Sequence, residues 1–367
     1  MTTVAVTGAS GSVGRALLER LEADRTVDRI VGVDLNEPDM PVAKLDFRPG
    51  DVRDPLLAHA LAGAGTVVHL AFTWAAFHGE DTMFAVNVQG TRNLLQAAHR
   101  AGVNKLVLLS TGVVYGAHPD NVVPLDESSP LRANPDFGYA HQRLLAEELV
   151  AEWTRAHPDA TVTVLRPAMT LGPGIDDVVS RHLEAPRLPL VGACEPPMQF
   201  VHVEDLADAL HLAVARDLPG AFNVAADGWL SVPELCALLG KKPLRAPETV
   251  AFAAARRLWR RGLLAVPAGA LRYVMYPWVL STERLHAQGW APAWSNREAL
   301  HEFVATHHEH LSLGRLRVRR RHLYVGAFAT AGAALGLLLA GPLRPAVRRR
   351  GRPVSGSRPA PEGRRQA

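Results

Sequence analysis

A glycine-rich turn near the amino terminus has the spacing of a phosphate-binding loop. The segment TGASGSVG (7–14) places glycine at positions 8, 11 and 14, between a short apolar run and a helical pattern. Glycine lets the backbone approach a pyrophosphate closely, and the free N–H groups of a helix N-terminus then stabilise the phosphate charge. No Gly-Lys-Ser/Thr follows, which excludes a nucleoside-triphosphate loop of that type. Such a turn can also be purely structural. As a binding site it would contact a dinucleotide through Gly8, Ser10, Gly11, Ser12, Val13 and Gly14.

An acidic residue lies where a dinucleotide site needs one. Asp34 ends the second apolar run of the chain, twenty residues after Gly14. A carboxylate at this point accepts hydrogen bonds from the adenosine ribose, and its charge repels a 2′-phosphate. The pattern therefore predicts NAD as the cofactor and makes NADP the less favoured alternative.

Apolar runs and helical patterns alternate through the first half of the chain. Strands as apolar as these, separated by helices, are typical of a parallel sheet that is buried on both faces. The crossovers of such a sheet are right-handed, so we predict an α/β fold with a Rossmann-like, doubly wound parallel sheet. The expected strands are 4–6, 30–33, 66–70, 105–110, 161–165 and 200–203, and the expected helices are 14–22, 87–101, 139–157 and 203–215.

The alternation stops after Gly172, and this change suggests a second region. Residues 174–198 are rich in proline, and 229–311 consist of helical patterns interrupted by proline. We expect a small C-terminal substrate lobe over the carboxyl edge of the sheet, followed by an appended apolar helix. The predicted boundaries are 1–172 for the NAD-binding domain, with 199–226 returning to it; 173–198 and 227–311 for the lobe; 312–322 for a basic linker; 323–343 for a candidate membrane helix; and 344–367 for a basic, disordered tail.

The basic charge of the chain is concentrated at its C-terminus. Residues 315–367 contain thirteen arginines and one acid, whereas the first 314 residues contain 27 basic and 35 acidic side chains. As a helix, the uncharged segment 323–343 would span about 30 Å, the thickness of a bilayer core. Arginines flank this segment without interleaved aromatic residues, which favours a membrane anchor over a nucleic-acid site. A helix docked on the body and a free tail are the alternatives.

The remaining composition narrows the class of protein. Hydrophobic residues make up 48% of the chain and charged residues 21%, as in proteins that bury a core. Cys194 and Cys236 are the only cysteines, which excludes a disulfide framework and a cysteine-based zinc site and is consistent with a cytoplasmic body. The histidines between positions 301 and 310 are expected on a solvated helix end, so we predict no metal site.

Seven further segments carry a common pattern. They are GDVRD (50–54), VVHLAF (67–72), NVQGTRNLLQAA (87–98), LLSTGVVYG (108–116), YAHQR (139–143), LRPAMTLGPG (165–174) and FVHVEDLADAL (200–210). In this order they resemble the extended short-chain dehydrogenase/reductases of the NAD-dependent epimerase/dehydratase type. The resemblance extends from Met1 to about Val304.

The resemblance implies a homodimer formed through the two long helices near Asn87 and Tyr139.

The resemblance also implies where the cofactor lies. In the family's pattern Asp51 and Val52 meet the adenine, Leu70 and Ala71 line the cofactor cleft, Asn87 stabilises the site helix, and the backbone at Pro167–Met169 passes beside the nicotinamide.

The same resemblance implies a catalytic set of Thr111, Tyr139 and the residue four positions after that tyrosine. Family members carry lysine there, and its charge lowers the pKa of a phenol that otherwise ionises near pH ~10. This chain carries Arg143, which keeps the charge but does not readily release its proton. Two hypotheses follow: Arg143 replaces lysine with some loss of rate, or the site binds its cofactor without catalysis. Only four of the 40 basic residues are lysine, which favours the first hypothesis.

Two features bear on the substrate. Met198 and Gln199 stand where relatives that act on nucleotide sugars carry Arg-Asp, so one bidentate partner for a diphosphate is missing. Residues 253–280 combine arginines with aromatic residues, and they form either a surface helix and ordinary lobe core or a face that rests on a membrane.

These observations lead to one expectation and two alternatives. We expect an NAD-dependent oxidoreductase that transfers hydride at a secondary alcohol or ketone carbon of a small, weakly charged or lipophilic substrate. A nucleotide-sugar epimerase or dehydratase is the first alternative. A non-catalytic, membrane-tethered sensor or interaction protein that binds a dinucleotide is the second.

Overall fold

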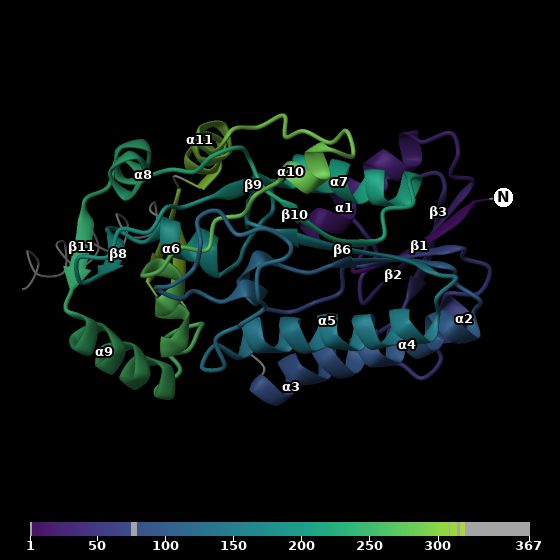
Figure 1. The fold of residues 1–367 in the computed structure, drawn as a ribbon, viewed down its shortest axis with the longest axis horizontal. Coiled ribbons are helices and arrows are strands. Elements are labelled where there is room, and N and C mark those ends of the chain that lie inside the picture. The colour runs from purple at the N-terminus through teal and green to yellow at the C-terminus, as the bar shows by residue number, and fades with distance from the viewer. Residues whose placement is uncertain (1, 75–78, 308, 314–315, 320–367) are drawn as a thin grey trace, which may run out of the picture. The chain divides into compact units, whose positions relative to one another are not determined.

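A parallel β-sheet forms the centre of the protein (Figure 1). The structure, a computed structural model, describes residues 2–74, 79–307, 309–313 and 316–319. Within these residues the sheet has seven strands in the order β10-β6-β5-β4-β1-β2-β3, and every neighbouring pair is parallel. The predicted Rossmann-like α/β sheet is thereby confirmed. The strands are β1 (Thr3–Thr7), β2 (Arg29–Asp34), β3 (Leu45–Pro49), β4 (Thr66–His69), β5 (Lys105–Leu109), β6 (Thr161–Pro167) and β10 (Gly220–Val224).

Helices cover both faces of this sheet (Figure 1). Successive side chains of a strand point to opposite faces, so the central strands contribute to an apolar cluster on each side. In β1, Val4 and Val6 belong to one cluster and Ala5 to the other. The first face is covered by α1 (Ser12–Ala23) and α7 (Val203–Ala215), and the second by α2 (Leu57–Ala60), α4 (Thr91–Arg100) and α5 (Gly138–Ala156).

The expected strands and helices are all present, and their ends differ from the expectation by a few residues. The sequence pattern does not indicate β3 or β10, which are the two edge strands of the sheet. Edge strands are covered less completely, so their sequences are less apolar. The side chains of β3 are all partly exposed, and β10 begins with Gly220 at a φ of 104°.

The expected helix 87–101 has an irregular beginning. A short helix, α3 (Glu80–Phe84), leads into a π-helical turn, η2 (Ala85–Gly90), and α4 continues from there. Isolated π turns occur frequently at functional sites because they redirect side chains from the regular helical positions. Here the turn contains Asn87.

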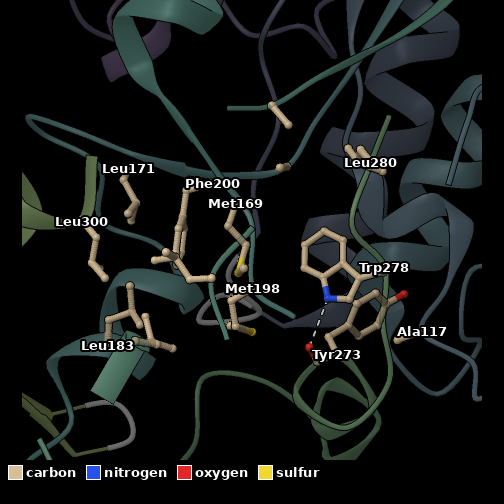
Figure 2. Close-up of a cluster of buried hydrophobic side chains, with 14 of the residues drawn as sticks. Ala117, Met169, Leu171, Leu183, Met198, Phe200, Tyr273, Trp278, Leu280 and Leu300 are labelled. Atoms are coloured by element: carbon tan, nitrogen blue, oxygen red, sulfur yellow. Dashed lines mark hydrogen bonds between the residues drawn. The ribbon is translucent and has the colours of Figure 1, made fainter. Parts of the chain in front are cut away.

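A third apolar core lies beyond the carboxyl ends of β5 and β6. Tyr115 and Met169, which follow these strands, belong to one cluster with Phe200 and Trp278. Figure 2 shows Met169, Phe200 and Trp278. The indole Nε1 of Trp278 donates a hydrogen bond of 3.1 Å to the carbonyl of Tyr273. The other elements up to His307 are η3 (Gly112–Tyr115), β7 (Met169–Leu171), α6 (Val178–Glu184), β8 (Leu188–Val191), β9 (Phe200–His202), α8 (Val232–Leu239), β11 (Pro243–Ala246), α9 (Glu248–Arg260), η4 (Ala268–Val274), α10 (Glu283–His286) and α11 (Asn296–His307).

The last described residues form a hairpin, which includes most of the segment 312–322 that was predicted as a basic linker. Strands β12 (His310–Leu313) and β13 (Leu316–Arg319) pair antiparallel. The buried carboxylate of Glu184, in α6, accepts hydrogen bonds from the Ser312 hydroxyl and from Arg317, whose Nε lies 3.0 Å away. This pairing holds the hairpin against α6.

The candidate membrane helix 323–343 and the tail 344–367 lie outside the described residues. Among the helices that the structure does describe, none combines the length and the apolar character needed to cross a membrane.

Candidate functional site

The turn between β1 and α1 can accept no side chain at two of its three predicted glycines. A Cβ on Gly8 would lie 2.7 Å from the carbonyl carbon of Leu70, and Gly8 has a φ of 75°. A Cβ on Gly14 would lie 2.3 Å from the carbonyl oxygen of Gly8. At Gly11 the nearest protein atom to such a Cβ is 3.5 Å away. The space at Gly11 and the uncapped N-terminus of α1 therefore fit a phosphate group.

Asp34 holds this turn in place. One of its carboxylate oxygens accepts a hydrogen bond from the Ser10 amide at 2.9 Å, and the other accepts one from the Leu35 amide at 2.7 Å. The Ser12 hydroxyl donates to the carbonyl of Gly174 at 2.6 Å. The predicted acid thus stands directly beside the glycine turn and remains partly exposed.

The predicted adenine-contacting residues lie beyond the carboxyl end of β3. Asp51 pairs with Arg53 at 2.6 Å, and this hydrogen-bonded ion pair holds the pKa of the Asp51 carboxyl below its usual value. Val52 is buried, and the Asn93 amide donates to its carbonyl at 2.8 Å. Sequence reasoning did not single out Asn93, which positions this loop from α4.

The end of β4 continues the same cleft. Leu70 and Ala71 are in van der Waals range of Gly8, as the predicted cofactor cleft requires. Next to them, His69 is fully buried, and its Nδ1 lies 2.7 Å from the Thr7 hydroxyl. Burial is the main reason that the pKa of His69 falls to about 3, and the charge of Arg143 adds to it. This histidine is therefore neutral and does not serve as a proton donor at neutral pH.

Arg143 is buried almost completely, with 2% of its surface exposed. Its guanidinium lies 3.3 Å from the centre of the Phe72 ring, and its Nη2 donates to the carbonyl of Leu109. Within the described part of the chain, Nε and Nη1 have no hydrogen-bond partner. Buried donors of a charged group rarely stay unpaired, because each unmade hydrogen bond costs free energy. Two free donors at this position therefore fit a ligand that carries acceptor oxygens.

Tyr139 and Arg143 are four residues apart on α5, so their side chains emerge on the same face of the helix. Burial raises the pKa of the Tyr139 phenol, while the positive charge of Arg143 acts in the opposite direction. Burial also lowers the pKa of Arg143 below its usual value. The two groups are thus electrostatically coupled, as the predicted catalytic set requires.

Thr111 follows β5 and begins the short helix η3. Its hydroxyl accepts a weak hydrogen bond of 3.4 Å from the amide of Val113. Tyr115, four residues later, is not available for chemistry. Its hydroxyl donates to Asn223 at 2.8 Å and accepts from Arg166 at 2.9 Å, and burial raises its pKa to about 12.

Two buried networks hold helix α5, and the sequence patterns did not indicate the first of them. Glu147, one turn beyond Arg143 on α5, forms an ion pair of 2.7 Å with Arg166 on β6, and both side chains are buried. Asn87, in the π turn, donates to the side-chain oxygen of Gln142 on α5 at 3.1 Å. Its other hydrogen bonds, of 2.8 and 2.9 Å, join the backbone of Thr73. The predicted role of Asn87 as a support of the site helix agrees with these contacts.

The predicted nicotinamide-side segment lies beside η3. The carbonyl oxygen of Pro167 is 3.2 Å from the position of a Cβ on Gly112. Ala168 and Met169 continue from Pro167 into the third core. Strand β6 therefore ends next to the short helix that Thr111 begins.

An apolar cavity of about 300 Å³ adjoins these residues. Its wall includes Val113, two residues after Thr111, and Phe137, two residues before Tyr139. The ring centres of Phe137 and Tyr139 are 5.9 Å apart. Further walls come from Met169, Met198, Tyr273 and Trp278, all labelled in Figure 2. Of the two residues that replace Arg-Asp, Met198 thus faces the cavity.

Gln199 has a structural role. Its amide nitrogen donates to the carbonyls of Ala226, Gly228 and Leu280, each at 3.1 Å, and its oxygen accepts from the Leu280 amide at 2.7 Å. Because these bonds use its donors, Gln199 has no free group to offer a diphosphate.

The model of the NAD dependent epimerase/dehydratase family matches residues 4–225. The chain belongs to this family. An uncharacterized protein of Mycobacterium tuberculosis is 29% identical over 310 residues, which is 82% of each chain. The N-acetyl-alpha-D-glucosaminyl-diphospho-ditrans,octacis-undecaprenol 4-epimerase of Escherichia coli O157:H7 is 36% identical over 181 residues, which is 46% of this chain and 49% of the other.

Solved structures of similar fold hold NAD. MoeE5 in complex with UDP-glucose and NAD is 25% identical, with a TM-score of 0.65 over 83% of this chain and 99% of the other. The dTDP-glucose 4,6-dehydratase DesIV of Streptomyces venezuelae, with NAD bound, superimposes with a TM-score of 0.66 at 24% identity and covers 84% of this chain and 97% of the other. These likenesses agree with the sheet described above and with the family's dependence on NAD.

Proposed function

We propose that this family member is an NAD-dependent oxidoreductase that acts at a secondary alcohol or ketone carbon. The observation that carries the proposal is the state of Arg143, which is buried beside the predicted catalytic tyrosine with two unpaired donors. A purely structural arginine would use these donors within the fold, as Arg166 does with Glu147. The free donors of Arg143 are proposed to bind the ribose hydroxyls of the cofactor.

The residues present fit NAD. The space at Gly11 and the N-terminus of α1 would hold the pyrophosphate, and Asp34 would accept hydrogen bonds from the adenosine ribose. Asp51 and Val52 would meet the adenine, and the backbone from Pro167 would lie beside the nicotinamide. When bound, NAD supplies the acceptor or donor of the hydride.

In this proposal Tyr139 moves the proton. Its phenolate takes the proton of the substrate alcohol in oxidation, and its hydroxyl gives a proton to the substrate oxygen in reduction. Arg143 stabilises the phenolate through its charge, against the effect of burial on the Tyr139 pKa. The Thr111 hydroxyl orients the substrate oxygen, since its contact with the Val113 amide is weak and easily replaced.

The cavity favours a substrate with an apolar body. We propose that the elements around the third core act as the substrate lobe. Met198 and the aromatic side chains of Phe137 and Trp278 offer hydrocarbon surface, and Gln199 offers no partner for a diphosphate. These features support a weakly charged or lipophilic small molecule.

Two alternatives keep specific support. A nucleotide-sugar epimerase or dehydratase would be in line with the named activity of DesIV. The E. coli relative is named as an epimerase as well, but of a sugar joined through a diphosphate to undecaprenol. A non-catalytic dinucleotide-binding sensor would be in line with arginine in the family's lysine position. Membrane anchoring through 323–343 and a homodimer through the helices near Asn87 and Tyr139 stay part of the proposal.

The first experiment is calorimetric titration of the full chain with NAD⁺ and, separately, with NADP⁺. We expect saturable binding that favours NAD⁺, followed by NADH formation with at least one apolar secondary alcohol. Binding of neither dinucleotide would refute the proposal. If the wild type binds NAD⁺ without turnover and Arg143→Lys creates turnover, the non-catalytic alternative is correct for the natural chain.

A further inference from the structure

An exposed apolar and basic surface covers α9 and the residues beside it. The structure's exposed large apolar side chains number ten among the described residues, and four of them lie within 244–263: Leu244, Val250, Leu258 and Leu263. Their exposed fractions are between 37% and 55%. Arg257 and Arg261 are exposed in the same stretch. These six side chains are called the α9 surface below.

The charge of this region is opposite to that of the body around it. No acidic residue occurs between Glu248 and Glu283, and this interval contains five arginines. The first 314 residues as a whole have more acids than bases, so the positive charge here is local. In the part of the chain that the structure describes, no ion pair involves Arg257 or Arg261.

The helix separates an inward face from an outward face. Ala255 is buried, whereas Val250, Arg257 and Arg261 are exposed. Spacings of seven and four residues put these three on one side of the helix. The outward face therefore combines the aliphatic Val250 with two long cationic side chains, whose stems can bury while their heads stay in water.

The inward face borders the apolar cavity of the candidate site. Ala255 and the segment 264–267 line this cavity, and so does Ser312 of the C-terminal hairpin. The described chain ends at Arg319, in β13. This strand pairs with β12, whose Ser312 lines the same cavity.

We propose that the α9 surface docks on an anionic lipid bilayer, on the outer side of the helix whose Ala255 lines the apolar cavity. Aliphatic side chains would enter the headgroup boundary, and the arginines would bind the anionic headgroups. A site for an acidic protein would need fewer exposed aliphatic groups, and a purely apolar partner would leave the arginines without counter-charge. The inference that docking delivers a lipophilic substrate rests on the proposed function, whereas the inference of docking itself does not.

Hydrogen exchange of the full chain tests this surface separately from the basic tail. Peptides from 248–263 are followed with phosphatidylcholine vesicles that contain phosphatidylglycerol, and with vesicles of phosphatidylcholine alone. We expect protection of this segment with the anionic vesicles only. Arg257→Glu/Arg261→Glu should remove the protection and weaken vesicle binding roughly 25-fold or more, because each arginine near an anionic surface contributes about a fivefold factor.

A charge-matched control is Arg25→Glu/Arg155→Glu, which changes two exposed arginines in the turn after α1 and at the end of α5. It should keep the protection of 248–263. The proposal is overturned if residues 248–263 of the vesicle-bound wild type are not protected, or if Arg257→Glu/Arg261→Glu keeps their protection. Protection that appears without lipid as the protein concentration rises would also overturn it, because it would indicate that a second copy of the chain covers this surface. Calorimetric NAD⁺ binding, measured on the same variants, reports separately on the proposed function.

Discussion

Replacing Gly11 by alanine separates binding of the cofactor from stability of the fold. In the structure a Cβ at Gly11 would lie 3.5 Å from the Gly8 carbonyl oxygen, an ordinary contact. Gly11 has a φ of −66°, which any residue adopts. The protein without cofactor should therefore tolerate the methyl group, and fewer unfolded conformations would stabilise it by about 0.4–1 kcal/mol.

The bound state should respond differently. If the pyrophosphate lies over Gly11, the methyl group occupies its place and weakens a charge-assisted hydrogen bond to the backbone. A loss of about 2 kcal/mol corresponds to a roughly thirtyfold increase in the dissociation constant for NAD⁺. The matched control is Gly14→Ala, whose Cβ would lie 2.3 Å from a backbone oxygen and should lower the stability of the fold itself.

The assays are calorimetric titration with NAD⁺ and thermal unfolding without it. The expected result for Gly11→Ala is an unfolding temperature at or above that of the wild type together with weak binding. Wild-type affinity in this variant would show that the pyrophosphate does not approach Gly11. A large drop in its unfolding temperature would show that the turn is structural.

Four further results are expected. Tyr139→Phe should abolish turnover and leave the unfolding temperature unchanged, and retained turnover would remove Tyr139 from the mechanism. Asp34→Asn should narrow the preference for NAD⁺ over NADP⁺, because the charge that repels a 2′-phosphate is lost; an unchanged ratio of dissociation constants would contradict this role. Burial raises the pKa of Asp177 to about 6. Between about pH 4 and 6 the native state therefore binds more protons than the unfolded state, and the free energy of unfolding falls as the pH rises through this range. Asp177→Asn keeps the helix cap and should make the free energy of unfolding depend less on pH across that range. An equal dependence on pH in both proteins would contradict the raised pKa of Asp177. Glu147→Gln leaves Arg166 buried beside a neutral partner and should cost about 3–5 kcal/mol in urea unfolding, whereas a loss below about 1 kcal/mol would mean that water reaches the pair.

The sequence patterns predicted the central sheet well and its edges poorly. Strands such as β1 and β5 are buried on both faces, so continuous apolar runs reveal them. β3 and β10 lie at the edges, where mixed composition is tolerated. The sequence patterns did not predict the hairpin at 310–319 either, because its attachment depends on Glu184, more than 120 residues away in sequence.

The basic-aromatic stretch 253–280 shows why a composition pattern leaves two hypotheses open. Tyr273 and Trp278 are buried in the third core, as ordinary lobe residues would be. Arg257 and Leu258 are exposed on α9, as a membrane-facing surface would require. The sequence contains both groups in one run, and only packing separates them.

By itself the sequence predicted the central strands of the sheet and the glycine turn with Asp34, because these features depend on local spacing along a strand or helix. Thr111, Tyr139 and Arg143 were indicated by the resemblance of the sequence to a known family. The tertiary structure alone decided the state of Arg143. Burial against Phe72 and the absence of partners for two donors among the described residues arise from elements that are distant in sequence. The same holds for the cavity, whose wall combines η3, β7, η4 and the C-terminal hairpin. Hydrogen-bond satisfaction and enclosed volume are properties of the packed molecule, and no local pattern encodes them.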